Sequence, residues 1–447
     1  MTITVKERIL GFPKIAYLFL ALSLRLALAP FLSHPFDERT FMAVGASVAK
    51  GITPYGQYLL KALFIETPHP HLALELVISG IWYPPPWGLL TGGLYLLSSS
   101  LAPNNLYVYV FALKLPVIIG ELALAGLVYY VLRQEDSEKT ATKGFLLVLF
   151  CPFIIAVGTV WGMFDALAMF FALFSAWSLQ ENWKVSAVFL SIASVLNVYP
   201  LLLVPLYAIL LYKHERKLST ATGFFSIIAV LTSLFTFVPM FVYNWPLSGM
   251  YNALTYQLGS TNSSYNSQAG VQFPYGTASP FNIFTLISEY VSKTFQPPSV
   301  LAYLWIPACL AIYVLLLRAK TSTKSDFGVA TTMKWSLLLV LTFFTTRVWV
   351  SEQNLVFLFT FFALTIILSN AEWTKLHILW IMLLSFVIVH VPAVLFLWMP
   401  YPWTLDSAGT FADGPLGFTR LLMMTILTFC WLVLTWDYVA RKLKWKL

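Results

Sequence analysis

The sequence contains little charge and little cysteine, and it lacks the common nucleotide-binding patterns. Charged residues make up 10% of its 447 residues, against roughly 25% in an average soluble domain. The three cysteines form no C-x-x-C pair, so neither a disulfide framework nor a zinc cluster is expected. Neither G-x-x-x-x-G-K-[ST] nor G-x-G-x-x-G occurs, which argues against nucleotide handling. Any group that the protein transfers would therefore have to arrive on an already activated donor.

Apolar residues take the place of charge. They make up 59% of the chain, and the mean hydropathy is +0.77. Repeated runs of about 17–25 apolar residues are long enough to cross a bilayer as helices and too long for barrel strands. We therefore predict an all-α, polytopic integral membrane protein. The candidate apolar segments are roughly 13–32, 82–101, 106–132, 144–157, 164–179, 185–196, 199–212, 219–242, 299–318, 332–347, 353–369, 375–399 and 416–440.

The basic residues predict the topology. Formal net charge is +8, and Lys and Arg gather before residue 15 and in 213–217, 318–324 and 441–446. Because Lys and Arg collect in cytoplasmic loops, both termini are predicted to be cytoplasmic and 13–32 to be an uncleaved anchor. This distribution explains the basic balance without a nucleic-acid partner.

Thirteen crossings would put the two termini on opposite sides, so one segment should not cross. The weakest is 82–101, because Pro84, Pro85 and Pro86 remove backbone donors and disfavour helix before them. We expect it to enter from the outer face and return, which leaves about 12 transmembrane helices. Irregular backbone at membrane depth must be buried or line a wet cavity, so an outward-facing cavity is expected beside the first external loop. The external regions would be 33–105, 158–165, 243–298, 347–354 and 400–415.

Acidic residues stand where two apolar segments meet the outer surface. Asp37 and Glu38 follow the first segment and begin a predicted interfacial helix, 38–50, and Asp165 begins the segment 164–179. Each acid could simply cap a helix. Alternatively, a carboxylate at the membrane surface could act as a general base toward an acceptor hydroxyl.

Several basic and polar residues have two interpretations. Lys114, Arg25 and Arg347 could extend to the headgroups or bind a phosphate, and Glu121 could be a proton-relay acid in a transporter. His69, His71 and Glu75 could form a metal site or simply belong to a surface loop. Asn197 and Tyr199 could line the cavity or simply turn the chain.

Several stretches, in this order along the chain, resemble a known family. The stretch HPFDERTFMAVGASVAKGITPY resembles the first external loop of GT-C glycosyltransferases that use polyprenyl-phosphate sugars. WYPPPW, KLPVIIGELALAGLVYYVLR and CPFIIAVGTVWGMFDALAMFFALFSAW resemble the elements that follow, and LNVYPLLLVPLYAI resembles their K-x-YP segment, with Asn197 where lysine is common. The likeness is greatest to archaeal members related to polyprenyl-phosphate-mannose mannosyltransferases and the GPI mannosyltransferase catalytic subunit. It covers about residues 1–215, and beyond them SPFNIFTLI and VSEQN are similar.

The resemblance implies a GT-C fold and an inverting sugar transfer. Asp37 would be the catalytic base and Glu38 a second catalytic acid, with Lys114, Arg347 and Arg25 binding the donor phosphate. The substrate-binding residues would be His34, Tyr83, Asp165, Tyr199, Glu352 and Asn354. The family's D-x-D is replaced by Asp37-Glu38-Arg39, so no metal and no other cofactor are expected.

The predicted organisation has two transmembrane modules, a catalytic one at 1–217 that includes loop 33–105, and a variable one at 218–447 that includes loop 243–298. The predicted function is transfer of one sugar, such as mannose or another hexose, from a polyprenyl- or dolichyl-phosphate donor. The acceptor would be a lipid-linked glycan, a glycolipid or a protein. The site would face outward from a cell membrane, or the lumen if the membrane is that of the endoplasmic reticulum. Alternatives are a secondary transporter or lipid flippase using Glu121 and Asp165, and a non-catalytic subunit.

Overall fold

A computed structural model describes residues 14–34, 37–55, 57–59, 77–79, 81–103, 105–251, 277–292, 294–295, 298–319, 327–369, 372–391 and 416–442. The expected alternatives for His69, His71 and Glu75, and the predicted loop 400–415, lie outside these residues.

Every predicted apolar segment contains a helix, which confirms the helical class. The helices are α2 (Lys14–Leu28), α3 (Asp37–Ala49), α5 (Pro85–Leu101), α6 (Leu106–Glu135), α7 (Glu138–Leu149), α8 (Pro152–Ile155), α9 (Asp165–Ser178), α10 (Trp183–Leu196), α11 (Leu203–Glu215), α12 (Leu218–Val242), α14 (Asn282–Tyr290), α15 (Trp305–Arg318), α16 (Val329–Thr346), α17 (Leu355–Leu368), α18 (Trp373–His390) and α20 (Gly417–Lys442). Short 3₁₀ turns are η2 (Tyr199–Leu202), η3 (Ser299–Tyr303) and η5 (Glu352–Asn354), and η1 (Ala156–Val160) is a π-helix. In the described part of the chain the only strands are the antiparallel pair β1 (Gln57–Leu59) and β2 (Val77–Ser79).

Seven helices among the described residues are long and apolar enough to cross a membrane. They are Leu106–Glu135, Glu138–Val160, Leu218–Val242, Val300–Arg318, Val329–Thr346, Trp373–His390 and Gly417–Arg441. Three shorter apolar helices are Asp165–Ser178, Trp183–Leu196 and Glu352–Leu368. Lengths of 18 residues and more match the thickness of a bilayer core, so these helices indicate a membrane-embedded protein.

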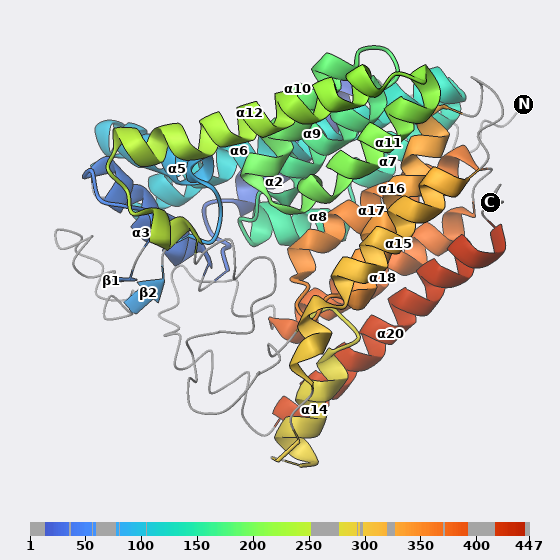
Figure 1. Cartoon of the computed structure of the whole chain (residues 1–447). Helices are drawn as coiled ribbons and strands as arrows, with labels where there is room; N and C mark the ends of the chain where they lie inside the picture. The colour runs from blue at the N-terminus through green and yellow to red at the C-terminus, as the bar shows by residue number, and fades with distance from the viewer. Residues whose placement is uncertain are drawn as a thin grey trace, which may run out of the picture.

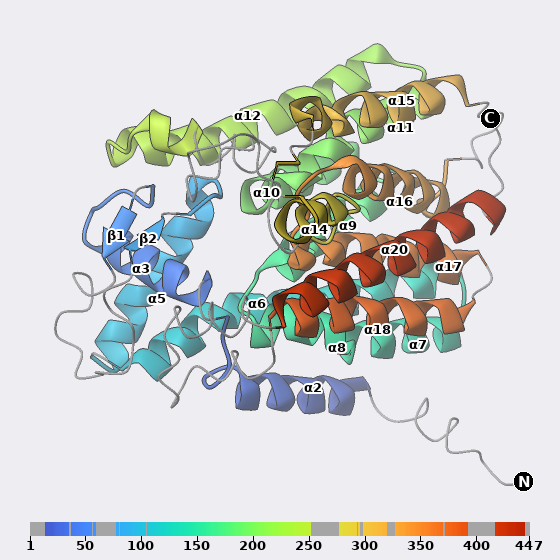
Figure 2. The same ribbon diagram turned by 90° about the horizontal axis from the view of Figure 1, so that it is seen from below.

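The basic stretches before residue 15 and at 213–217, which are predicted to be cytoplasmic, lie at one end of the molecule together with the loops that contain residues 138–143 and 372–375. We call this end the basic end. Figure 2 shows α2 beginning and α20 ending at this end. Ion pairs and ring contacts join the loops there, among them Lys14–Glu138, Lys143–Trp373, His214–Phe327 and Lys375–Asp437. The predicted grouping of these loops is thus present in the fold.

The loops predicted to be external meet at the opposite end, which we call the site end. The His34 N–H donates to the Trp161 carbonyl at 3.0 Å, and the Ala278 N–H donates to the Val350 carbonyl at 2.8 Å. The Tyr55 hydroxyl donates to the carbonyl of Tyr83 at 3.0 Å. Segments far apart in the sequence are therefore neighbours here.

The proline-rich segment forms one continuous helix, α5, and the expected re-entrant shape is wrong. Pro85 and Pro86 occupy its first turn, where an N–H would have no helical acceptor, so the prolines begin the helix. The second half of α5 lies beside the start of α6, with the Tyr95 and Tyr109 rings 5.2 Å apart. From there α6 runs to the basic end, so α5 itself does not take the chain to that end (Figure 1).

Helix α3 is packed inside the protein, although the sequence predicts an interfacial helix. Its residues 38–47 are all buried, and it contacts α5 and α6. Gly45 permits the close approach, because a Cβ there would lie 2.1 Å from the Tyr109 hydroxyl and 2.7 Å from the Thr91 carbonyl oxygen. Because Gly45 has no side chain, α3 can pack closely against α5 and α6, and this packing positions the acidic first turn of α3.

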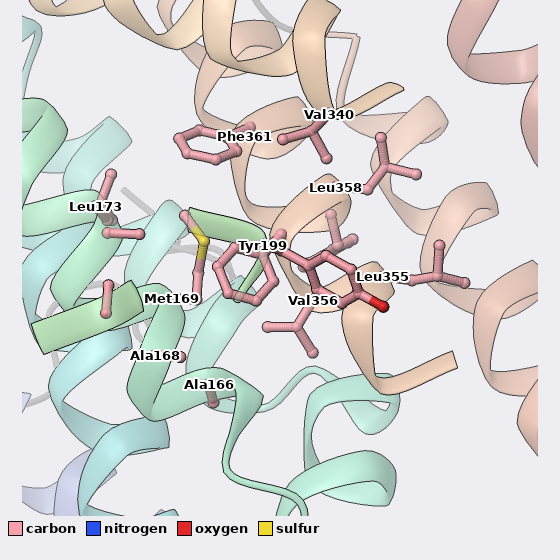
Figure 3. Close-up of a cluster of buried hydrophobic side chains, with 14 of the residues drawn as sticks. Ala166, Ala168, Met169, Leu173, Tyr199, Val340, Leu355, Val356, Leu358 and Phe361 are labelled. Carbon is pink, nitrogen blue, oxygen red and sulfur yellow. The ribbon is translucent and has the colours of Figure 1, made fainter. Parts of the chain in front are cut away.

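The two predicted modules share one hydrophobic core. The blue-to-green helices of the first half and the yellow-to-red helices of the second half meet along α9, α16 and α17 (Figure 1). Figure 3 shows Tyr199 in this junction, among Met169 of α9 and Leu355 and Val356 of α17. The site end is therefore built by both halves of the chain.

Candidate active site

Asp37 is the accessible acid of the site end. It is the first residue of α3, and its side chain keeps 28% of its surface exposed. The Trp161 indole Nε1 donates to Asp37 Oδ2 at 2.7 Å, and the Trp161 ring stacks on His34 with centroids 4.3 Å apart. The carboxylate is thus held by a side chain from the turn after the π-helix η1.

His34 is a neutral imidazole. Its Nδ1 accepts the backbone N–H of Asp37 at 3.2 Å, and burial lowers the pKa of His34 to about 3. The same Nδ1 lies 3.3 Å from Asp37 Oδ2, but without a proton this contact is no ion pair. Burial raises the pKa of Asp37 to about 6, with the Trp161 hydrogen bond acting in the opposite direction. Asp37 is therefore a stronger base than an ordinary aspartate.

Glu38, which follows Asp37 in α3, and Lys114 of α6 are both buried. The Lys114 ammonium donates to the carbonyls of Leu32 and Val160, so it ties the loop after α2 to the end of η1. Burial raises the pKa of Glu38 to about 7, and the Lys114 charge opposes this shift. Glu38 Oε1 has no hydrogen-bond partner among the described residues. The Lys114 ammonium thus donates hydrogen bonds to backbone carbonyls, and this geometry does not support its predicted contact with a donor phosphate.

Gly162 permits Glu38 to sit there. Its φ is +104°, which favours glycine, and a Cβ at Gly162 would lie 2.4 Å from Glu38 Oε2. The preceding π-helix is a local irregularity of the kind often found at functional sites. Backbone geometry in the VWGMFD stretch therefore places Trp161 and Asp165 on either side of one turn.

A chain of polar side chains connects Asp165 with the second half of the protein. Asp165 Oδ1 accepts from Asn197 Nδ2 at 2.9 Å, and that nitrogen is 3.5 Å from Asn354 Oδ1. Asn354 Nδ2 in turn donates to the Tyr199 hydroxyl at 3.1 Å. Asp165 Oδ2 has no partner among the described residues. One acceptor of a buried carboxylate thus remains unused.

Tyr83 is close enough to Asp165 and Asp37 to be affected by their charges. Burial and the neighbouring charges of Asp165 and Asp37 raise the pKa of Tyr83, whose phenol is also hydrogen-bonded to Gln353. The structure therefore brings five of the predicted residues into one cluster, which we call the acidic cluster: Asp37, Tyr83, Asp165, Tyr199 and Asn354.

Arg347 is the unusual cation of the site. It is 1% exposed, and its Nε, Nη1 and Nη2 have no hydrogen-bond partner among the described residues. Its guanidinium lies over the rings of Tyr199 and Phe343, at 4.9 and 5.2 Å from their centroids. A buried guanidinium without hydrogen bonds is costly, so this arrangement favours an anionic ligand.

Glu352 is 1% exposed and pairs with His390 Nδ1. His390 is the last residue of α18. The direct partner of Glu352 is thus an imidazole that the sequence does not indicate, and its role in substrate binding stays a prediction.

Arg25 and Glu121 form a separate, closed pair. Arg25 Nε donates to Glu121 Oε2, and its other nitrogens donate to the carbonyls of Ala21 and Leu149. Glu121 also accepts from the backbone and hydroxyl of Thr159. Because the Arg25 nitrogens already donate to three protein groups, its predicted phosphate contact is not supported by the geometry. The transporter alternative for Glu121 stays a prediction.

Sequence reasoning missed Trp161, Gln353 and His390. Trp161 lies within the VWGMFD stretch, but the sequence does not indicate that its indole N–H donates to Asp37, 124 residues away. His390 lies 38 residues from Glu352, and no spacing could have linked them. Among the described residues no group of three or more His, Cys, Asp or Glu side chains could hold a metal ion.

No family model matches the chain, and no curated protein matches its sequence.

Proposed function

We propose that the protein is a membrane-embedded, inverting glycosyltransferase of GT-C type. It would move one hexose, such as mannose, from a polyprenyl- or dolichyl-phosphate to an acceptor hydroxyl on the extracytoplasmic side. The observation that carries the proposal is the pairing of an accessible base with an unsatisfied buried cation. Asp37 supplies the base and Arg347 the cation, and the acidic cluster connects them.

The chemistry follows from these two groups. Asp37 would take the proton of the acceptor hydroxyl, and the acceptor oxygen would attack the anomeric carbon of the sugar. The bond from that carbon to the phosphate oxygen would break, and the lipid phosphate would leave with the electron pair. Arg347 would bind the phosphate and stabilise its growing charge. Asp165 Oδ2 and the Asn354 amide would bind sugar hydroxyls.

The topology of the proposal has twelve crossings. The seven long and three shorter apolar helices would supply ten of them, and α2 and η2–α11 the other two. Helix α5 would lie on the outer side. The positive-inside rule then puts the basic end in the cytoplasm and the acidic cluster outside.

Donor consumption by the purified protein tests the proposal. The protein in detergent is incubated with polyprenyl- and dolichyl-phosphate mannose and glucose plus a membrane lipid extract, and the loss of donor is measured. Asp37→Asn should lower the rate at least about 100-fold, because a positioned general base contributes that much or more.

Asp136→Asn is the matched control. Asp136 is an exposed aspartate that follows α6 at the basic end, so this variant should retain the full rate. An Asp37→Asn protein that consumes donor as fast as the wild type would contradict the proposed role of Asp37.

A further inference from the structure

We infer that Arg25 and Glu121 position the base of the site: the Glu121 carboxylate anchors the π-helix η1, and η1 holds Trp161 against Asp37. The inference rests on the proposed function for the role of Asp37 as a base. It gives a buried ion pair of the helix bundle a role in the reaction that acts through another residue.

Glu121 of α6 is hydrogen-bonded to the backbone of η1. Its Oε1 accepts the Thr159 backbone N–H at 2.6 Å, and the Thr159 hydroxyl lies 3.1 and 3.2 Å from the two carboxylate oxygens. A backbone N–H inside a helix ordinarily donates to a carbonyl of the same helix, and a side chain that enters this ladder distorts it. Glu121 therefore holds η1 from a neighbouring helix.

Gly158 leaves the space that the carboxylate occupies. A Cβ at Gly158 would lie 1.9 Å from Glu121 Oε1, so a larger residue would push the carboxylate away from Thr159. The Trp161 N–H donates to the carbonyl of Ala156, five residues earlier, at 2.9 Å, which is the π-helical pattern. The glycine, the carboxylate and the irregular turn thus occur at one place.

Arg25 holds Glu121 in turn. Both side chains are completely buried, and Arg25 Nε donates to Glu121 Oε2. Its Nη1 and Nη2 donate to the carbonyls of Ala21 and Leu149 at 3.2 and 2.9 Å. A carboxylate removed from water is costly unless an ion pair and hydrogen bonds compensate it. The guanidinium therefore compensates the buried carboxylate and fixes the oxygen that accepts from Thr159.

The site begins directly after this anchor. The Trp161 carbonyl accepts the His34 N–H at 3.0 Å, and the Trp161 indole Nε1 donates to Asp37 Oδ2 at 2.7 Å. Trp161 follows Thr159 by only two residues, so the anchored turn decides where the indole N–H points. The pair thus acts on Asp37 through Trp161.

The double variant Arg25→Met with Glu121→Met tests the inference. It removes the anchor and leaves neither charge unpaired, so the protein should keep most of its stability. The midpoint of the Asp37 titration should move upward by about 1–2 pH units, because the carboxylate loses a charge-assisted hydrogen bond.

Two measurements report this midpoint. Infrared difference spectra of the substrate-free protein across pH follow the protonated-carboxyl band that Asp37→Asn removes. The acid limb of the kcat/KM profile for sugar transfer reports the same group in the working enzyme. The ionisable neighbours Glu38 and Asp165 and the neutral His34 stay in place in the double variant, so their influence on Asp37 is common to both proteins.

Two further variants sharpen the test. Trp161→Phe added to the double variant should move the midpoint no further, because both changes remove the same hydrogen bond. Gly158→Ala keeps both charges and displaces the carboxylate, so it should give the upward shift by itself and decides the question if the double variant folds poorly. Gly126→Ala is its control, since a Cβ there would have no atom within 4 Å, and should leave the midpoint unchanged.

The two ideas fail separately. A stable double variant with the wild-type infrared midpoint overturns the positioning role, even if the wild type transfers sugar. The wild-type midpoint in Gly158→Ala, or a further shift when Trp161→Phe is added to the double variant, overturns it as well. An upward shift in both variants that Trp161→Phe does not extend supports the role even where the wild type consumes no donor, and in that case the proposed function fails alone.

Discussion

Arg347→Met separates a ligand-binding arginine from a structural one. Arg347 and Arg25 are both almost completely buried, at 1% and 0% exposure. Arg25 donates to three protein groups, whereas the three nitrogens of Arg347 have no hydrogen-bond partner among the described residues. The two arginines should therefore respond in opposite directions when replaced by methionine, which has a similar shape and no charge.

The magnitudes follow from what each guanidinium loses. Arg25→Met leaves Glu121 as an unpaired buried carboxylate, which should cost about 3–5 kcal/mol of folding free energy. Arg347→Met gives up cation–π contacts worth about 1–2 kcal/mol and removes an uncompensated buried charge. Even a whole buried ion pair can often be replaced by well-packed apolar side chains at no cost or with a gain of about 1–4 kcal/mol. We expect the stability of Arg347→Met to be unchanged or higher.

Donor binding should be affected differently from stability, because Arg347→Met should weaken it although this variant folds normally. If Arg347 binds the donor phosphate, its charge-assisted hydrogen bonds contribute about 1.5–3 kcal/mol to binding. Arg347→Met should then weaken the apparent donor affinity roughly 10- to 150-fold. The assays are thermal unfolding in detergent, and donor titration with the lipid-phosphate sugar that the wild type consumes.

One result would refute this reasoning. If Arg347→Met lowers the unfolding temperature as much as Arg25→Met, Arg347 is a structural residue and its missing hydrogen bonds do not indicate a ligand. Arg25→Met with Glu121→Met serves as the control, because removing both charges should recover much of the stability that Arg25→Met loses.

Four further predictions concern the base, its hydrogen-bond partner and two glycines at close helix or loop contacts. Sugar transfer should fall as the pH drops through about 6, because Asp37 becomes protonated there, and kcat/KM against pH measures the midpoint. Trp161→Phe should move this midpoint upward, because the indole N–H favours the ionised carboxylate; an unchanged midpoint would contradict the hydrogen bond. Gly162→Ala should cost about 1–3 kcal/mol of stability, since its φ is +104°, as thermal unfolding would show. Gly120→Ala should cost a similar amount, about 1–3 kcal/mol, because its Cβ would lie 2.6 Å from backbone of α9. Gly126→Ala is the control for both glycines, as its Cβ would have no atom within 4 Å, and equal losses in all three would refute the steric explanation.

The structure corrects the sequence where local rules are ambiguous. Pro84–Pro86 predict a broken segment, but prolines at the start of a helix are tolerated, and α5 is continuous. The interfacial helix is buried, because Gly45 and its neighbours let α5 and α6 approach closely. Neither outcome can be read from local composition, since both depend on which helices pack against the segment.

The sequence alone indicates Asp37, Asp165 and Arg347 as candidate site residues, because acids and bases are rare in apolar sequences and stand out there. Their partners could not be identified in the same way. Trp161 reaches Asp37 across 124 residues, and Asn354 reaches Tyr199 across 155. Contacts at such separations depend on the packing of α9 against α16 and α17.

The sequence by itself determined the helical class, the positions of the apolar segments and the end at which the basic loops gather. These properties depend on hydrophobicity and charge, which are summed along the chain and need no knowledge of packing. Only the tertiary structure decided which charges are satisfied. Arg25 and Arg347 look alike in the sequence, yet Arg25 is paired with Glu121, whereas Arg347 lies over Tyr199 with no hydrogen-bond partner among the described residues. Low-dielectric surroundings make that difference large, and it is the reason for assigning Arg347 to a ligand and Arg25 to the fold.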